Sequence, residues 1–453
     1  MLFSLTNPEV AIMMMCIFLF AVLLGFPIAF TLMAMGLGFG YYAYFDPTKM
    51  EHLFDNRIFQ LFVQNTYTVM DNNVLTAVPL FLFMGYLVER AGIVAKLFFA
   101  IRLASHKLPA SMAVAALITC ALFSTATGII GAVVTLMGLL AWPAMIKAGY
   151  DKKFASGIIC SGGCLGILIP PSIMLIVYSV IAQLSPLRLF AAAIFPGLML
   201  AGLYIAYAVF RAWLNPSIAP KPAAEEIPPT AVILKEVLVS FLPLFSLIIL
   251  VLGTILAGIA TPAEAAAVGA FGSLVLSYFY KTLKWKNFKE SVFLTAKTTA
   301  MIMWLFIGSW TFASVFSYLG GHEVFEHFFK SLNLQPWQFL VITQLIIFLL
   351  GWPLEWTEIL IIFVPIFLPL VEFFGVNPYF FAMLIALNLQ TSFLTPPMAM
   401  SAYYLKGVQS KNVELMQIFG GIMPFLGIVI LAMVLMYLFP GIALWLPETL
   451  FAN

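Results

Sequence analysis

The chain has 453 residues, of which 63% are hydrophobic and only 9% are charged, and its formal net charge at pH 7 is +2. Soluble globular domains carry about a quarter of charged residues, so this composition excludes a soluble globule. It indicates a polytopic membrane protein, because apolar runs long enough to span a bilayer recur along the whole chain. The small net charge identifies no partner, and we expect a lipid bilayer around the chain and no bound nucleic acid.

The first apolar run, residues 10–44, is long enough for two helices separated at Gly25 and Pro27. It has neither a basic leader nor an obvious cleavage site, so we expect two retained helices and no signal peptide.

Lys and Arg gather in some loops and acidic residues in others, which orients a membrane protein by the positive-inside rule. The basic loops lie at 102–107, 147–153, 211–235, 281–289 and 406–411. We therefore expect these loops in the cytoplasm and both termini in the periplasm. The segment 281–289 also contains aromatic residues, and we predict that it is a short interfacial piece.

The segments 109–123 and 129–146 flank a polar, turn-prone cluster at 124–128. Both outer ends are basic, so we predict a re-entrant hairpin that enters from the cytoplasm and turns inside the membrane. The next apolar run, 154–183, is interrupted by the double proline at 170–171. Proline lacks the backbone N–H and its ring clashes with the preceding turn, so we predict a broken helix with freed carbonyl groups.

The second half repeats this order. Segments 339–350 and 359–373 flank a polar tip at 351–358, and the run 379–405 is broken by the double proline at 396–397. The outer ends of this hairpin are weakly charged and follow an acidic stretch, so we expect it to enter from outside. Two hairpins of opposite sidedness, each followed by a broken helix, make an inverted repeat, which is typical of secondary transporters with sites near the midplane.

The first candidate site combines hydroxyl groups at the first tip with a glycine run before the first double proline. Its members are Ser124, Thr125, Thr127, Gly162, Gly163 and Gly166. Hydroxyls and exposed carbonyls form a hard-oxygen environment that suits an alkali cation, so we predict a sodium site. The alternative is that these small residues only allow helices to approach closely.

The second candidate site is a dense polar stretch in an apolar helix, facing the second tip. Its members are Asn388, Gln390, Thr391, Ser392 and Thr395, opposite Glu355, Trp356 and Thr357. We predict a functional site here, shared between a second cation and the substrate. Glu355 could ligate a cation or relay a proton, whereas a tip that reaches water would leave it solvated.

Helix ends that point at the midplane favour an anionic substrate, so backbone amides and hydroxyls should carry most of its recognition. The nearest basic side chains are Arg90 and Arg188, and we place Arg188 at the outer surface. The candidate substrate contacts are Ser124, Pro170, Pro171, Ser172, Gln390, Ser392, Pro396, Pro397 and Met398.

The stretch at 149–157, its continuation at 165–172 and the motif at 394–397 resemble the large membrane subunit of tripartite ATP-independent periplasmic (TRAP) transporters. The resemblance covers nearly the whole chain. Within the family, residues 128–136 resemble the branch often labelled mannitol or chloroaromatic. The second tip departs from the family pattern at Trp352, Pro353 and Trp356, which leaves its cavity shape and the substrate open.

The resemblance implies a sodium-driven importer of small organic anions in the bacterial inner membrane, working by an elevator motion without an organic cofactor. It implies two partners, a small four-helix membrane subunit and a periplasmic substrate-binding protein. Because the chain begins at its first large-subunit helix, we expect the small subunit to be a separate chain. Carried over by position, the sodium sites involve 124–127 with 162–166, and 355–357 with 388–395.

The resemblance also implies a division into a moving transport domain and a fixed scaffold. We predict scaffold helices at 1–107, at 188–335 with a cytoplasmic linker at 214–234, and a single scaffold helix at 411–453. The transport domain would comprise the first hairpin with its broken helix at 108–187 and the second at 336–410.

Two other functions fit parts of the pattern. A two-component sodium symporter of the divalent-anion type shares paired hairpins but needs no periplasmic receptor. An intramembrane hydrolase would need a nucleophile and a base at membrane depth. All four histidines fall in or near loops and no Gly-x-Ser-x-Gly motif occurs, so we expect no enzyme activity.

Overall fold

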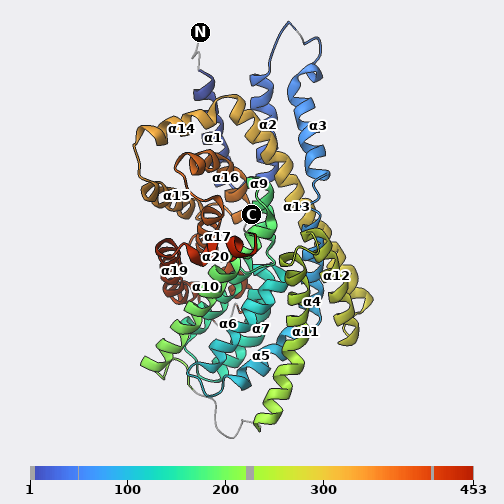
Figure 1. Cartoon of the computed structure of the whole chain (residues 1–453), viewed down its shortest axis with the longest axis vertical. Coiled ribbons are helices and arrows are strands. Elements are labelled where there is room, and N and C mark those ends of the chain that lie inside the picture. The colour runs from blue at the N-terminus through green and yellow to red at the C-terminus, as the bar shows by residue number, and fades with distance from the viewer. Residues whose placement is uncertain (1–5, 49, 221–228, 410–412, 452–453) are drawn as a thin grey trace.

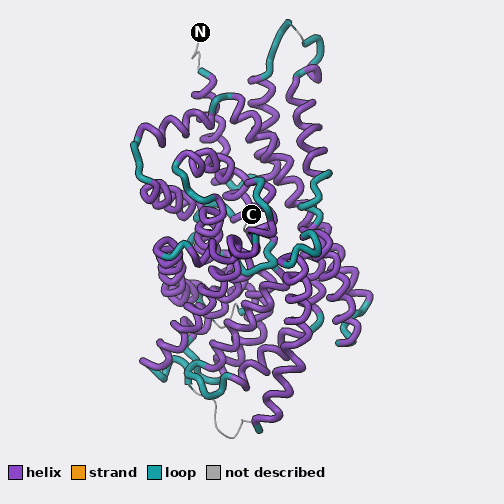
Figure 2. Tube along the Cα trace, in the orientation of Figure 1, coloured by secondary structure: helices purple, strands orange, loops and turns teal. Residues whose placement is uncertain are grey.

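The computed structural model describes residues 6–48, 50–220, 229–409 and 413–451, and these contain helices and loops without a strand (Figures 1 and 2). Seven helices in these ranges are long and apolar enough to cross a membrane, or eight if the bent pair α4 (Ala77–Arg90) and α5 (Ile93–Ala104) forms one span. The prediction of an all-α polytopic membrane protein is confirmed.

The first apolar run forms α1 (Asn7–Leu23) and α2 (Ile28–Ala43), as predicted. Gly25, which separates them, has a φ of +85°, a conformation that a residue with a side chain rarely adopts. A short 3-10 turn, η1 (Leu53–Asp55), and α3 (Arg57–Met70) lead from there to α4.

The first hairpin consists of α6 (Ser111–Thr127) and α7 (Ile130–Lys147), joined at Gly128, whose φ is +63°. The broken helix follows as α8 (Lys152–Cys164), the 3-10 turn η2 (Leu165–Ile167) and α9 (Ile173–Ala182). The predicted interruption at the double proline is therefore present. Whether the hairpin is re-entrant, and from which side it enters, stay predictions.

The second hairpin consists of α15 (Pro336–Leu350) and α16 (Trp356–Phe373), followed by the broken helix α17 (Pro378–Leu394) and α18 (Met400–Val408). Its tip is shorter than predicted, because α16 already begins at Trp356 with Glu355 as the N-cap residue.

Outside the two hairpin units, the structure differs from the sequence-based expectations at three places. The predicted linker at 214–234 overlaps α11, which starts at Thr230, and residues 221–228 lie outside the described part. The predicted interfacial piece at 281–289 contains the first turn of the 34-residue α13. Two helices, and not one, follow residue 413. The helices concerned are α10 (Pro186–Leu214), α11 (Thr230–Leu256), α12 (Pro262–Phe279), α13 (Trp285–Tyr318), α14 (Gly321–Ser331), α19 (Leu415–Leu438) and α20 (Gly441–Leu450).

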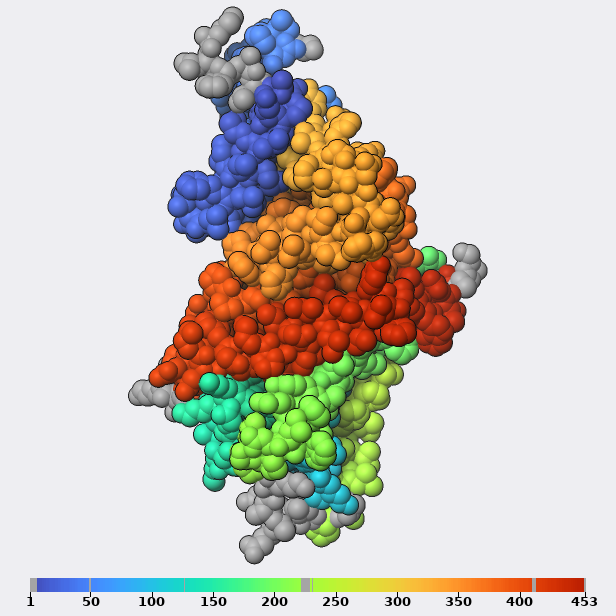
Figure 3. Space-filling view, turned by 90° about the vertical axis from the view of Figure 1, so that its left-hand side faces the viewer, coloured from blue at the N-terminus to red at the C-terminus, as the bar shows by residue number. Residues whose placement is uncertain are grey.

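The hairpins pack across the two halves of the chain. Helix α7 of the first hairpin lies against α18 of the second broken helix, and α16 lies against α9 of the first. The sequence-based division placed α10 and α19 in the scaffold, yet α10 packs on α6 and α17, and α19 packs on α8 and α17. Figure 3 shows the red C-terminal helices crossing the middle of the molecule with green segments directly below. A second group comprises α2, α3, α4, α12 and α13, in which α2, α3 and α4 pack on α13 and α12 packs on α4.

Helices α8 and α19 cross at two glycines whose backbones touch the opposite helix. A Cβ atom on Gly421 would overlap the Lys153 carbonyl and lie 2.7 Å from Ser156 Oγ. A Cβ on Gly157 would overlap the Gly421 carbonyl in turn. Only glycine permits this approach, which fixes α19 onto the broken helix.

Gly421→Ala should therefore destabilise the protein by about 1–3 kcal/mol, the usual cost of forcing extra atoms into a packed contact. Gly427→Ala on the same helix is the matched control, since nothing lies within 4 Å of its added Cβ. The control should be neutral or slightly stabilising, because alanine favours helix by up to about 1 kcal/mol. Thermal unfolding in detergent measures both, and equal melting temperatures for the two variants would contradict the proposed contact.

Candidate functional site

A cavity of about 140 Å³ lies where both hairpin tips and both broken helices meet. The first tip contributes Gly128 and Gly131, the second contributes Glu355 and Thr357, and α18 contributes Tyr404. Residues of α4 and α13, from the second helix group, close the remaining side. The cavity therefore lies at the border between the two groups of helices.

The N-terminal ends of three helices line this cavity. Ile130 begins α7, Ile173 begins α9 and Trp356 begins α16, and all three residues line it. The first turn of a helix carries backbone N–H groups without intrahelical partners and a partial positive charge. Three such ends directed at one small space form an environment that attracts an anion.

The side chains at the cavity have the opposite charge. Among the described lining residues, Glu355 is the charged one, and no Lys, Arg or His is present. Thr357 Oγ1 is buried without a hydrogen-bond partner, as is Glu358 Oε2 in the same helical turn. A carboxylate and a hydroxyl without partners in a dry site are stabilised when a cation or a proton joins them.

The predicted first cluster is only partly assembled around Ser124. A Cβ on Gly166 would lie 2.5 Å from Ser124 Cβ, so the tip and the broken helix touch there, and Ser124 Oγ is buried without a partner. Thr125 Oγ1 donates to the Ala121 carbonyl and Thr127 Oγ1 to the Phe123 carbonyl, both within α6.

The two glycines that precede Gly166 have other neighbours. Gly162 packs against Cys120 and Gly163 against Val134, so both serve the contact between α8 and the first hairpin. The structure thus brings Ser124 and Gly166 together and leaves Gly162 beside the hairpin stem.

A serine hydroxyl replaces a missing backbone donor at each double proline. The residue four positions after Ile167 is Pro171, which has no N–H, and Ser172 Oγ donates to the Ile167 carbonyl at 2.6 Å. In the second half, Ser401 Oγ donates to the Phe393 carbonyl at 2.7 Å.

The residue four positions after Phe393 is Pro397, so the two serines have the same role. Sequence reasoning missed Ser401, although a serine close behind a double proline is a recognisable signal.

The two breaks differ in exposure, since Pro170 and Pro171 are buried whereas Pro396 and Pro397 are exposed and Met398 is half-buried. The peptide bond between the prolines is cis at both breaks.

The predicted second cluster divides between two places. Asn388 Nδ2 donates to the Gln344 carbonyl at 2.6 Å and to its Oε1 at 2.9 Å, which ties α17 to the stem of the second hairpin. Asn388 and Thr391 border a largely apolar groove of about 410 Å³ between α15, α17 and α19. Ser392 instead faces the tip, since a Cβ on Gly351 would lie 2.9 Å from Ser392 Cβ.

The other members of this cluster are buried next to the break. Thr395 Oγ1 donates to the Thr391 carbonyl at 2.8 Å, so its hydroxyl continues the helix beyond Leu394. Gln390 is fully buried, and neither of its polar atoms has a hydrogen-bond partner. A ligand that reached Gln390 would therefore satisfy two groups at once.

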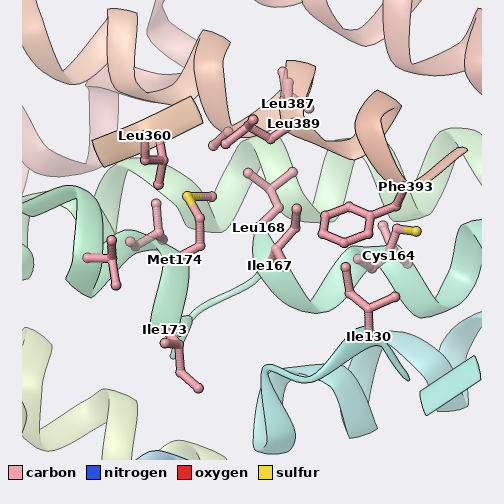
Figure 4. Packing of buried hydrophobic residues seen from close by; sticks show 14 of the residues in the cluster. Ile130, Cys164, Ile167, Leu168, Ile173, Met174, Leu360, Leu387, Leu389 and Phe393 are labelled. Atoms are coloured by element: carbon pink, nitrogen blue, oxygen red, sulfur yellow. The ribbon is translucent and has the colours of Figure 1, made fainter. Parts of the chain in front are cut away.

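Apolar side chains from both halves interlock around the breaks. Figure 4 shows Leu360 of α16 beside Met174 of α9, and Phe393 of α17 beside Ile130 and Ile167. These residues are buried in one continuous core. Among the residues that the structure describes, no group of three or more His, Cys, Asp or Glu side chains could hold a metal ion.

Comparison with known proteins identifies the family. The family model described as "Tripartite ATP-independent periplasmic transporter, DctM component" matches residues 15–442. The chain belongs to this family. Its relatives are transporters and not enzymes, and the resemblance seen in the sequence is confirmed.

Several members of the family are similar over most of the chain. The C4-dicarboxylate TRAP transporter large permease DctM of Pseudomonas aeruginosa is 28% identical over 85% of this chain and 88% of its own length. The sialic acid TRAP transporter large permease SiaM of Vibrio cholerae is 30% identical over 84% and 87%. The isethionate permease DctMQ of Oleidesulfovibrio alaskensis is 28% identical over 84% of this chain but 59% of its own length.

The fold is also found in a solved structure of low sequence identity. The YdaH transporter of Alcanivorax borkumensis superposes with a TM-score of 0.62 at 15% identity, over 96% of this chain and 99% of that one. This large TRAP permease therefore has a membrane-transporter fold.

Ser172→Ala and Ser401→Ala should each destabilise the permease by about 1–3 kcal/mol, because each leaves a buried carbonyl without a donor. Ser246→Ala is the control, since its hydroxyl bonds to the Pro243 carbonyl on an exposed helix face. Thermal unfolding measures all three variants. A control that loses as much stability as the other two would contradict a special role for the serines at the breaks.

Proposed function

We propose that this permease imports a small organic anion across the bacterial inner membrane, driven by sodium and by an elevator motion of the hairpin units. The observation that carries this proposal is the cavity at which three helix N-termini and Glu355 meet at the border of the two helix groups.

Sodium coupling follows from the charges at the cavity. The helix ends favour an anion, but the Glu355 carboxylate repels one. A sodium ion held by Glu355 and Thr357 would remove this repulsion, and the substrate would then bind only after the cation. Ser124 Oγ has no hydrogen-bond partner and lies beside Gly166, where the first hairpin tip meets the first broken helix. It would be an oxygen ligand of a second sodium site.

An organic acid is the substrate class that this arrangement supports. No basic side chain of the described lining is available to neutralise the anion, so backbone N–H groups and the bound cation would do so. The relatives are named for a C4-dicarboxylate, for sialic acid and for isethionate, all of which are acids. A carboxylate or sulfonate of modest size is therefore the expected cargo.

The packing suggests which helices move. The hairpins and broken helices pack with α10, α19 and α20, so we assign these three helices to the transport domain and not to the scaffold. Helices α2, α3, α4, α12 and α13 form the opposing body. The cavity at their border would then be carried across the membrane with the transport domain.

Two partners complete the proposed system. The family name refers to a tripartite, periplasmic system, and we propose a small membrane subunit and a periplasmic binding protein that delivers the anion. The relative DctMQ combines two of the component names in one protein. We place both termini of this permease on the periplasmic side, in line with the loop charges.

Uptake into proteoliposomes tests the coupling. The permease with its two partners should take up succinate, N-acetylneuraminate or isethionate only when a sodium gradient is present. Glu355→Gln should raise the sodium concentration for half-maximal uptake by about tenfold or more, because it removes the charge that holds the ion. Glu372→Gln, at the other end of α16 and exposed, is the matched control. Uptake that ignores sodium would refute the coupling.

The second polar cluster has its own test. Asn388→Ala and Thr395→Ala should both shift the sodium dependence of uptake if the predicted ion site extends to this helix. Unchanged sodium dependence in both variants would remove the cluster from the ion sites. Asn388→Ala should in addition lower stability, because it breaks both bonds to Gln344.

A further inference from the structure

We propose that Arg90 and a polar stripe on α13 form a track that guides the anion between the cavity and the start of α13. This proposal rests on the anion transport proposed above.

The stripe consists of Asn287, Ser291, Thr295 and Thr298. Their spacing of three and four residues places them on one face of the helix. Thr298 lines the cavity, and Ser291 is fully buried. Ser291 Oγ and Thr295 Oγ1 each donate to the backbone carbonyl four residues earlier, so these two hydroxyls are satisfied within α13, and the attraction of the stripe for an anion comes from Arg90 beside it.

Helix α4 supplies the other side of the track. The hydroxyls of Tyr86 and Thr298 lie 3.1 Å apart, and Tyr86 is buried. One turn further along α4, Arg90 Nη1 donates to Ser291 Oγ at 3.3 Å and to the Tyr86 carbonyl at 3.4 Å. Tyr86 and Arg90 thus continue the polar surface from the cavity along α13.

The guanidinium of Arg90 retains capacity to bind an anion. Its third contact, to Glu290, is 3.5 Å long, so all three contacts exceed the usual length of a charge-assisted hydrogen bond. Arginine has five N–H donors, and its side chain here is 20% exposed. An exposed ion pair of this length contributes little, since Glu290 is itself 47% exposed. A passing carboxylate or sulfonate could therefore replace Glu290.

The position of Arg90 gives the track a direction. Ser291 lies two helical turns, about 10 Å, from Thr298 toward the start of α13. That end of the helix follows the basic loop that the positive-inside rule places in the cytoplasm. Arg90 would thus receive the anion after it leaves the cavity. Its weak contacts suit this role, because a conducting site must also release what it binds.

Labelling with charged thiol reagents tests the track without knowledge of the substrate. Thr295→Cys is made in a Cys16→Ser background, since Cys16 is exposed and the other three cysteines are buried. In native membrane vesicles, a negatively charged methanethiosulfonate should modify Thr295→Cys. Adding Arg90→Gln should lower the ratio of anionic to cationic reagent rates by about tenfold, because Glu89 and Glu290 would then remain without the guanidinium.

Three controls separate this role from a merely structural one. Arg90→Lys should largely retain the ratio, since the charge is kept. Lys96 lies on α5, the helix after α4, and its ammonium group lies over the Tyr280 ring. Lys96→Gln removes this cation and should leave the ratio unchanged. Val292→Cys, on the exposed apolar face of α13, should show no dependence on Arg90. Thr298→Cys gives a second position on the track if Thr295→Cys fails to fold.

The outcomes are distinct for the two proposals. The track proposal would be wrong if neither reagent modifies the cysteines at positions 295 and 298. It would also be wrong if the ratio of anionic to cationic reagent rates is the same with and without Arg90. A ratio that depends on Arg90 in a permease that transports none of the three acids would support the track and refute the proposed substrate class. In a transporting permease, Arg90→Gln should raise the half-saturation concentration on the cytoplasmic side and leave the periplasmic one unchanged.

Discussion

Each double proline leaves a backbone carbonyl without its donor in the interior of a membrane protein, where water cannot replace it. Ser172 and Ser401 satisfy the Ile167 and Phe393 carbonyls, and both serines are buried, although Pro396 and Pro397 at the second break are exposed. Each hairpin tip covers part of one break. Gly166 touches Ser124 at the first break, and Gly351 touches Ser392 at the second. Each contact pairs a glycine with a serine. In the first, the glycine lies on the broken helix and the serine at the tip, whereas in the second the serine lies on the broken helix and the glycine at the tip. The packing of each hairpin tip on its broken helix therefore covers part of each interruption.

Covering the breaks also creates the site. A helix that restarts after an interruption directs its unpaired N–H groups toward the gap, and the second helix of a hairpin does the same at its tip. The starts of α7, α9 and α16 therefore converge on one cavity, although no side chain of positive charge is placed there among the described lining residues. Glu355 opposes this positive field. Under the proposed function, the same backbone geometry would therefore favour an anion and make its binding depend on a cation.

Features determined by local chemistry could be predicted from the sequence, and features determined by tertiary packing could not. The breaks, both hairpins and the two N-terminal helices follow from proline, glycine and runs of apolar residues, and all are present. The sequence predicted that Asn388 faces the second hairpin tip, but its side-chain amide donates to Gln344 on α15. Which way a residue of α17 faces depends on how α15 packs against that helix. The start of α16 at Trp356 and the joining of 281–289 to α13 also depend on neighbours. The packing of α10 and α19 on the hairpin units relies on contacts such as Gly157 with Gly421, which no local pattern reveals.

Glu355 at the cavity and Arg90 beside Ser291 belong to different bodies under the proposed division. Glu355 lies on α16 in the moving unit, whereas Arg90 lies on α4 in the scaffold. Sliding of one body past the other would therefore change the field that an anion experiences, from one dominated by the bound cation and helix ends to one that includes the guanidinium. Loss of the cation from Glu355 would restore its repulsion of the anion at the moment when Arg90 is within reach. The Glu355 carboxylate on the moving unit would then repel the anion, and the Arg90 guanidinium on the scaffold would attract it. Binding and release would therefore need no basic residue at the cavity itself.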